Sequence, residues 1–315
     1  MCRVKTLAAE SKLLHEKARI LSLRIEIKLM FVPRKILEAK LLECLAEDIG
    51  QGDVTVTAIV PAATIVEAEI IAKERGIAAG IEETVILAQS LGLNINVKVT
   101  DGDVFKNKQV IVKVAGHART ILTAERTILN LLSRMSGIAT TTRKLAERIK
   151  KANLTTRIAA TRKTAPGLLY FDKKAVQIGG GDAHRLHLDD LVLIKDNHIK
   201  ITGSVEDAVR MARTEVSFTK KIEVEITNPE EATRAAEAGA DIIMLDNFSP
   251  KQIKLTVELL KKARHFGKII LEASGGITAK NLLEYALTGV DVLSLGELTH
   301  SVKSLDLSLE ITRVN

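Results

Sequence analysis

Charged residues and small-residue turns follow almost every apolar run in the second half of the chain. In chain order they are Arg162 and Lys163, Lys195, Glu225, Asp246, Ser274-Gly275-Gly276 and Gly296. Glu225 and Asp246 are 21 residues apart, Asp246 and Ser274 are 28 apart, and Ser274 and Gly296 are 22 apart, each about one strand plus one helix. Parallel strands would bring these residues to the carboxyl rim of a barrel, where active sites of that architecture lie. The pattern therefore predicts a functional site.

The basic residues in this part of the chain indicate what the site binds. They are Arg162, Lys163, His184, Arg185 and Lys195. An arginine fork matches a carboxylate or phosphate with two hydrogen bonds, and lysine supplies a compact charge. Surface charge explains Arg162 and Lys163 equally well when they are taken alone. Taken together, the five residues predict a pocket for anions.

Two carboxylates and two turns complete the predicted rim. Glu225 and Asp246 are its acidic strand-end residues, and they suit Mg²⁺ held through substrate oxygens or hydrogen bonds to ribose hydroxyls. The turns at Ser274-Gly275-Gly276 and Gly296 would leave backbone N–H groups near helix starts, which favours phosphate. The rim thus fits a phosphorylated sugar beside a second anion.

Other glycines and histidines have simpler explanations. Residues 179–181 are three glycines, but they match neither the dinucleotide-binding nor the P-loop pattern, so a tight turn is expected. His184, His187 and His198 could suggest zinc. However, the first two are three residues apart without a clear third ligand, and their cationic neighbours would repel a metal ion. No zinc site is expected.

The overall composition limits the classes of partner. The net charge of +7 over 315 residues favours anionic partners, but aromatic residues make up only 3% and none is Trp. Basic residues without interleaved aromatics argue against nucleic acid. Cys2 and Cys44 are the only cysteines, which is typical of a reducing, cytoplasmic setting. No apolar run is long enough to span a membrane.

The segments that must position the site alternate between strands and helices. After residue 155 the expected strands are 157–161, 191–194, 221–226, 241–245, 268–272 and 290–295, with helices at 229–238, 250–264 and 279–287. Such alternation predicts a parallel sheet, and six or seven similar units favour a closed or nearly closed barrel over an open sheet.

The first half has a different pattern. Strands are expected at 65–72, 95–99 and 110–114, with helices from Pro33 and over 82–91. A long helical stretch at 120–152, interrupted at Ser136-Gly137, should link this α+β lobe to the barrel. The predicted domains are an extension at 1–29, the lobe at 30–135, the barrel at 136–297, and a C-terminal segment at 298–315 that packs back toward the lobe.

Five sequence blocks resemble the quinolinate phosphoribosyltransferase family, also called nicotinate-nucleotide pyrophosphorylase. They are EDIGQGDVT at 47–55, ERT at 125–127 with SGIAT at 136–140, TRKTAPG at 161–167, HR at 184–185 with LIKDNHI at 193–199, and EASGGIT at 272–278. The blocks occur in the family's order over about residues 32–313. Residues 1–29 have no counterpart, and Met30 lies where such a chain would begin.

The resemblance implies an incomplete α/β barrel with an N-terminal α+β sandwich lobe, in a dimer with sites at the interface. The implied reaction converts quinolinate and phosphoribosyl pyrophosphate to nicotinate mononucleotide, pyrophosphate and CO₂ with Mg²⁺, in NAD biosynthesis. By resemblance, Thr161, Arg162, Lys163, His184, Arg185 and Lys195 surround the quinolinate carboxylates and nearby phosphate. Arg126 would come from the partner subunit. Glu225 and Asp246 would face ribose and Mg²⁺, and the turns Ser274-Gly275-Gly276 and Ser294-Leu295-Gly296 the phosphate.

Three departures from the family pattern concern the acid pocket. Ala183 stands where Asn usually precedes the His-Arg pair, Leu169 where Arg is common, and His187 where Gly is frequent. Two alternatives therefore stay open: a related phosphoribosyltransferase-like protein associated with molybdenum transport, and a non-catalytic binder of phosphorylated ligands. The KDNH sequence at 195–198 favours the quinolinate enzyme, and a mere binder would not need both Glu225 and Asp246. Lys163, or a water that it holds, is expected to deliver the proton that replaces the departing carboxylate.

Overall fold

The computed structural model describes residues 32–315, and the predicted extension at 1–29 lies outside them. The described chain forms two compact units. The parallel unit comprises residues 145–162 and 182–296; the antiparallel unit comprises residues 32–144, 163–181 and 297–315. Residues 163–181 come from the stretch predicted for the barrel, and by their contacts they belong to the antiparallel unit.

The parallel unit is built on a six-stranded sheet. Its strands are β6 (Arg157–Ala159), β7 (Val192–Ile194), β8 (Ile222–Ile226), β9 (Ile242–Asp246), β10 (Ile270–Ser274) and β11 (Val292–Ser294), in the order β6-β11-β10-β9-β8-β7. All neighbours are parallel. Of these six strands, the first in sequence, β6, pairs with the last, β11, while β6 and β7 end the sheet unpaired with each other, as in a barrel that is open at one point. The predicted incomplete barrel is confirmed.

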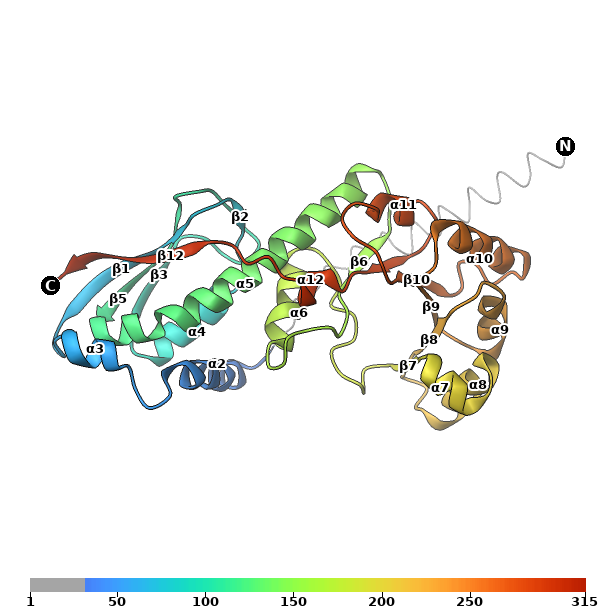
Figure 1. Cartoon of the computed structure of the whole chain (residues 1–315), viewed down its shortest axis with the longest axis horizontal. Coiled ribbons are helices and arrows are strands. Elements are labelled where there is room, and N and C mark those ends of the chain that lie inside the picture. The colour runs from blue at the N-terminus through green and yellow to red at the C-terminus, as the bar shows by residue number, and fades with distance from the viewer. Residues whose placement is uncertain (1–31) are drawn as a thin grey trace. The chain divides into compact units, whose positions relative to one another are not determined.

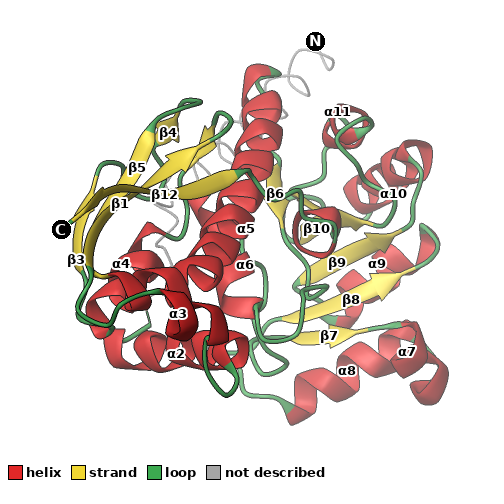
Figure 2. Cartoon of the chain, turned by 60° about the vertical axis from the view of Figure 1, so that its left-hand side comes forward, coloured by secondary structure: helices red, strands yellow, loops and turns green. Residues whose placement is uncertain are grey.

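Helices cover one face of this sheet. They are α7 (Asp196–Thr202), α8 (Val205–Glu215), α9 (Glu230–Ala238), α10 (Pro250–Lys262) and α11 (Leu282–Ala286). Figure 2 shows β7 to β10 side by side, with α8 to α10 along their outer side. The start of α10 is fixed by a capping box between Ser249 and Gln252, with Pro250 in the first turn.

The antiparallel unit contains a four-stranded sheet, shown in Figure 1. Its order is β12 (Leu307–Val314), β1 (Ile65–Ala72), β5 (Val110–His117) and β3 (Asn94–Val97), and a separate pair joins β2 (Gly76–Ile77) to β4 (Val104–Phe105). The helices are α2 (Arg34–Ile49), α3 (Val54–Ile59), α4 (Ile81–Ser90), α6 (Leu169–Ile178), α12 (Glu297–His300) and α5 (Ala118–Lys151), whose last residues, 145–151, belong to the parallel unit. Ala68 and Val114 of the sheet pack with Ala88 of α4 and Ile121 of α5 in one core cluster.

The predicted interruption at Ser136-Gly137 is wrong, because α5 runs unbroken through 34 residues. The reason for glycine there is close packing within the antiparallel unit. A Cβ on Gly137 would lie 2.2 Å from the carbonyl oxygen of Lys303, so only glycine lets that segment approach the helix. Among the described residues, no helix is both long and apolar enough to cross a membrane.

Candidate active site at the strand ends of the parallel unit

The inner face of the parallel sheet is polar. Residues in register on neighbouring parallel strands point to the same face, and side chains alternate along each strand. Glu225 is in register with Met244, and Met244 with Glu272. The alternate residues are buried and apolar, as expected for the face under the helices: Val224, Ile243, Leu271 and Leu293. The polar strand residues therefore gather on the side away from the helices.

The strand ends bring predicted site residues into one layer. Asp246 is in register with Ser274, and Ser274 with Ser294. The N–H of Leu295 donates to the carbonyl of Ala159 at 2.9 Å, so the turn at 294–296 follows directly at the edge. Three residues far apart in sequence thus lie on adjacent strands at the carboxyl rim.

Asp246 is oriented by its neighbour Asn247. The Asn247 amide nitrogen donates to Asp246 Oδ2 at 2.7 Å, and the Asn247 N–H donates to the carbonyl of Ser274 at 2.8 Å. Asn247 has φ 56° and Gly275 has φ 87°. A Cβ on Gly275 would lie 2.2 Å from Asn247 Oδ1, so the turn requires glycine to leave room for this amide.

Lys195 and Glu225, predicted separately as cation and carboxylate, form an ion pair. Lys195 Nζ donates to Glu225 Oε2 at 2.8 Å, and the Lys195 N–H donates to His198 Nδ1 at 2.8 Å. His198 is thereby engaged at the start of α7. In the structure the charge of Lys195 is balanced by Glu225, and the charge of Glu225 by Lys195. An anion that binds Lys195, or a cation that binds Glu225, would therefore compete with this ion pair.

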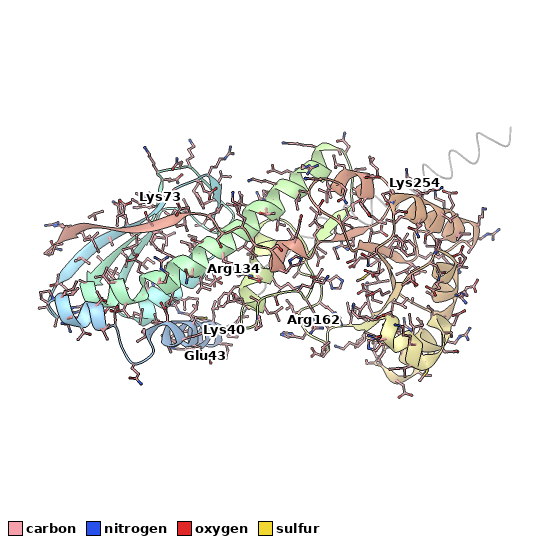
Figure 3. All side chains as sticks on the ribbon, viewed as in Figure 1. Lys40, Glu43, Lys73, Arg134, Arg162 and Lys254 are labelled. Carbon is pink, nitrogen blue, oxygen red and sulfur yellow. The ribbon has the colours of Figure 1, made fainter. Side chains whose placement is uncertain are left out.

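Arg162 and Arg185 are a pair of neighbouring cations. Arg162 lies in the loop after β6 (Figure 3). Partial burial lowers the pKa of Arg185, and the positive charge of Arg162 lowers it further, while Glu223 and Asp190 act in the opposite direction. Two guanidinium groups that disfavour each other's charge are stabilised by an anion between them, so this part of the rim is suited to a carboxylate or phosphate.

A buried cluster lies on the inner face, formed by carboxylates two residues before Glu225 in β8 and two residues before Ser274 in β10. Glu223 and Glu272 are 0% and 2% exposed. His184 Nε2 lies 3.1 Å from Glu272 Oε2 and 3.5 Å from Glu223 Oε2, and Ser294 Oγ donates to Glu272 Oε1 at 2.5 Å. Glu272 therefore joins the predicted residues His184 and Ser294, and Glu223 contacts His184 as well; neither carboxylate was predicted.

The two carboxylates favour the protonated form of His184. Burial lowers the pKa of His184, but hydrogen bonds and charge from Glu223 and Glu272 outweigh burial and raise that pKa to about 10. Burial raises the pKa of Glu223, and His184 partly opposes this. A His184 ring with its pKa at about 10 is positively charged at neutral pH, opposite the two buried carboxylates.

Two groups of possible metal ligands occur among residues 32–315. One is His184 with Glu223 and Glu272, and the other is the exposed group of His187, Asp189 and Asp190. Neither contains more than one histidine, and neither includes Glu225 or Asp246. The expected absence of a zinc site at His184, His187 and His198 stays a prediction, although these histidines do not share one group. Glu225 and Asp246 supply the hard oxygen donors that suit Mg²⁺.

The remaining predicted residues divide between the two units. Thr161 follows β6 in the parallel unit, and Asn281 Nδ2 donates to the carbonyl of Gly276 at 3.0 Å. Arg126 and Lys163 belong to the antiparallel unit. The carbonyl of Lys163 accepts a hydrogen bond from Thr299 Oγ at 2.8 Å, which anchors its backbone to α12.

Sequence reasoning missed Glu223, Glu272 and Asn247. The signal for the first two was present as alternation: Glu223 is two residues before Glu225, and Glu272 two before Ser274, in otherwise apolar runs. A period of two places each pair on the same face of its strand. Asn247 had no comparable signal, because its role depends on a turn from another strand.

Two family models and several known proteins match this chain. Residues 53–136 match the family model "Quinolinate phosphoribosyl transferase, N-terminal domain", and residues 138–310 the C-terminal one. A "probable nicotinate-nucleotide pyrophosphorylase [carboxylating]" of Methanothermobacter thermautotrophicus is 49% identical, over 85% of this chain and 96% of that protein. The human nicotinate-nucleotide pyrophosphorylase [carboxylating] is 39% identical, over 81% and 85%. The Francisella tularensis structure of that name is 38% identical with a TM-score of 0.81, over 90% and 98%.

Proposed function

We infer that this chain, which belongs to the quinolinate phosphoribosyl transferase family, joins quinolinate to phosphoribosyl pyrophosphate. The products are nicotinate mononucleotide, pyrophosphate and CO₂, which makes the chain a pentosyltransferase of NAD biosynthesis. The observation that carries the proposal is the rim itself, where the neighbouring cations Arg162 and Arg185 occur with the strand-end carboxylates Glu225 and Asp246. A phosphorylated sugar and a dicarboxylate need both kinds of group.

The basic residues would hold quinolinate. Arg162 and Arg185 can each offer a fork to a carboxylate, and Lys195 adds charge if substrate draws it from Glu225. Family resemblance adds His184 and Lys163 near the acid, and Arg126 from a second copy of the chain. Burying two polyanions together is costly unless their charge is balanced, which accounts for this surplus of cations.

The acidic residues and the turns would hold the sugar phosphate. Asp246, oriented by Asn247, and Glu225 would bind ribose hydroxyls and Mg²⁺. The metal, when bound, would stabilise negative charge on pyrophosphate as it leaves. The backbone N–H groups of the turns at 274–276 and 294–296 would bind the phosphate. A phosphate bound there would lie beside Asp246, Ser274 and Ser294, which are in register at the carboxyl ends of adjacent strands.

The chemistry is a displacement followed by loss of CO₂. The quinolinate nitrogen forms a bond to the anomeric carbon as the bond to pyrophosphate breaks, and positive charge develops on the ribose ring. Groups fixed in advance around the separating charges supply most of the stabilisation. The C2 carboxylate then leaves as CO₂, its electron pair stays on the ring carbon, and Lys163 or a water that it holds supplies the proton. No serine or cysteine nucleophile is required.

One assay tests the proposal. Purified protein is incubated with quinolinate, phosphoribosyl pyrophosphate and Mg²⁺, and nicotinate mononucleotide is detected by chromatography. We expect product that depends on all three. Product from nicotinate but not from quinolinate would keep the reaction class and reject the substrate. Full turnover by Lys163→Ala would reject the proton-donor role of that residue.

A further inference from the structure

The His184 ring, which the resemblance places beside substrate, has both nitrogens engaged within the protein. Nε2 faces Glu272 Oε2 at 3.1 Å and Glu223 Oε2 at 3.5 Å. Nδ1 lies 2.7 Å from the backbone nitrogen of Arg185. The ring is therefore held from two directions, with Nε2 against the two carboxylates and Nδ1 against the main chain of the next residue.

The backbone at His184 is held in an unusual conformation by contacts on both sides. His184 has φ 54°, which is costly for a residue with a side chain. Its N–H donates to Asp182 Oδ1 at 2.8 Å, and Asp182 is tied to β6 through its own N–H, which donates to the carbonyl of Ile158 at 2.7 Å. The turn is thus fixed to β6 by Asp182 and to β8 and β10 by the His184 ring.

Glu272 is itself fixed on both oxygens. Ser294 Oγ of β11 donates to Oε1 at 2.5 Å, while Oε2 faces the imidazole. Glu223, fully buried, supplies a second carboxylate to the same ring nitrogen. The cluster therefore links β8, β10 and β11 to the turn at His184, and Asp182 links the same turn to β6. Arg185 is the next residue after His184.

We propose that Glu272, supported by Glu223, is a positioning residue that acts through His184 to hold Arg185 in the anion site. The His184 ring links the carboxylates of Glu223 and Glu272 to the main chain at Arg185, and we call this linkage the bracket. Arg185 contributes the positive charge that contacts the substrate. The part of this inference that concerns substrate rests on the proposed function. The part that concerns the bracket does not.

The first test is a spectroscopic one on the unaltered protein. The chain has 7 histidines, so selective ¹⁵N labelling gives few signals, and a His184→Asn variant assigns the relevant one. We expect Nε2 of His184 to carry a hydrogen at neutral pH, because Glu272 and Glu223 both face that nitrogen. A ring whose Nε2 carries no hydrogen would overturn the proposal, because the carboxylates could not then hold it. This measurement remains decisive if a variant fails to fold.

The second test uses three variants of similar size. Glu272→Leu removes both acceptors without leaving a large cavity, and Glu272→Gln keeps an acceptor for Nε2 and a partner for Ser294. Glu258→Gln, on the exposed side of α10, is the matched control. Calorimetric titration with quinolinate alone should show affinity at least about tenfold weaker for Glu272→Leu, and within about threefold of wild type for the other two. KM for quinolinate should rise, while KM for phosphoribosyl pyrophosphate and kcat change little.

The outcomes separate the two proposals. If wild-type protein neither binds quinolinate nor forms product, the proposed function fails, and the ring-protonation measurement still judges the bracket. If wild type binds and turns over but Glu272→Leu binds quinolinate as tightly as wild type, the positioning role is rejected. A loss in kcat alone, with binding intact, would also reject it.

Discussion

Replacing Arg134 should show how strongly a buried ion pair holds the antiparallel unit together. Arg134 lies midway along α5 (Figure 3). Its Nε and Nη2 donate to the two carboxylate oxygens of Asp172 at 2.7 and 2.9 Å, and Nη2 also donates to the carbonyl of Thr299 at 3.1 Å. Asp172 of α6 is 0% exposed. Burial raises the pKa of this carboxyl, and Arg134 opposes the shift.

The magnitude follows from what each substitution leaves behind. Arg134→Ala leaves a buried carboxylate without its partner, which costs about 3–5 kcal/mol of unfolding free energy. Arg134→Lys keeps a charge but loses the fork, and should cost about half as much. Asp172→Asn leaves a guanidinium that is partly exposed, at a cost of about 1–2 kcal/mol. The double variant Arg134→Ala with Asp172→Asn removes both charges, so its loss should be smaller than the sum of the two single losses.

Urea unfolding followed by circular dichroism measures these differences. The dependence of the unfolding free energy on urea concentration is compared between variants, to check that each unfolds in the same kind of transition. Additive losses, with a coupling below about 0.5 kcal/mol, would refute the reasoning. A loss below about 1 kcal/mol for Arg134→Ala would do the same. Arg134 also holds the carbonyl of Thr299, and Thr299 Oγ holds the carbonyl of Lys163. Arg134→Ala should therefore also lower turnover in the proposed assay. Thr299→Val should lower turnover without a large loss of stability.

Three further outcomes follow from single features of the two units. Gly275→Ala should displace Asn247 and cost about 1–2 kcal/mol for the positive φ alone; with it, KM for phosphoribosyl pyrophosphate should rise, and unchanged kinetics would contradict the role of this turn. Gly137→Ala should lower the melting temperature, because its Cβ would meet the carbonyl of Lys303 at 2.2 Å; a wild-type melting curve would show that the segment yields easily. The folded-state pKa of His184 lies above its ordinary value of 6.5, at about 10, so its stabilisation is present below pH 6.5 and lost as the pH rises toward 10. The urea midpoint should therefore fall over that interval, more in wild type than in His184→Asn, and equal falls would count against the cluster.

Local sequence patterns were sufficient for the elements that carry the site. Each strand of the barrel was recognisable as a short β-branched run, and the polar residue at its end was visible because it interrupts that run. Asp246 and Ser274 needed only the inference that the strands are parallel, since parallel strands bring their carboxyl ends to one edge. Strand β10 ends at Ser274 rather than at Glu272, a difference of the size that local patterns cannot resolve.

What the sequence by itself determined was therefore the barrel, its order of strands and helices, and the polar character of its rim, because these depend on periodicity within short segments. The tertiary structure alone decided which polar groups meet. The unbroken course of α5 depends on Lys303, more than 160 residues away, and the pairing of Arg134 with Asp172 joins two helices. The bracket of Glu223 and Glu272 around His184 depends on the register of strands and on a turn between them. Charges and carbonyls act through space over a few ångströms, and only the folded chain fixes those distances.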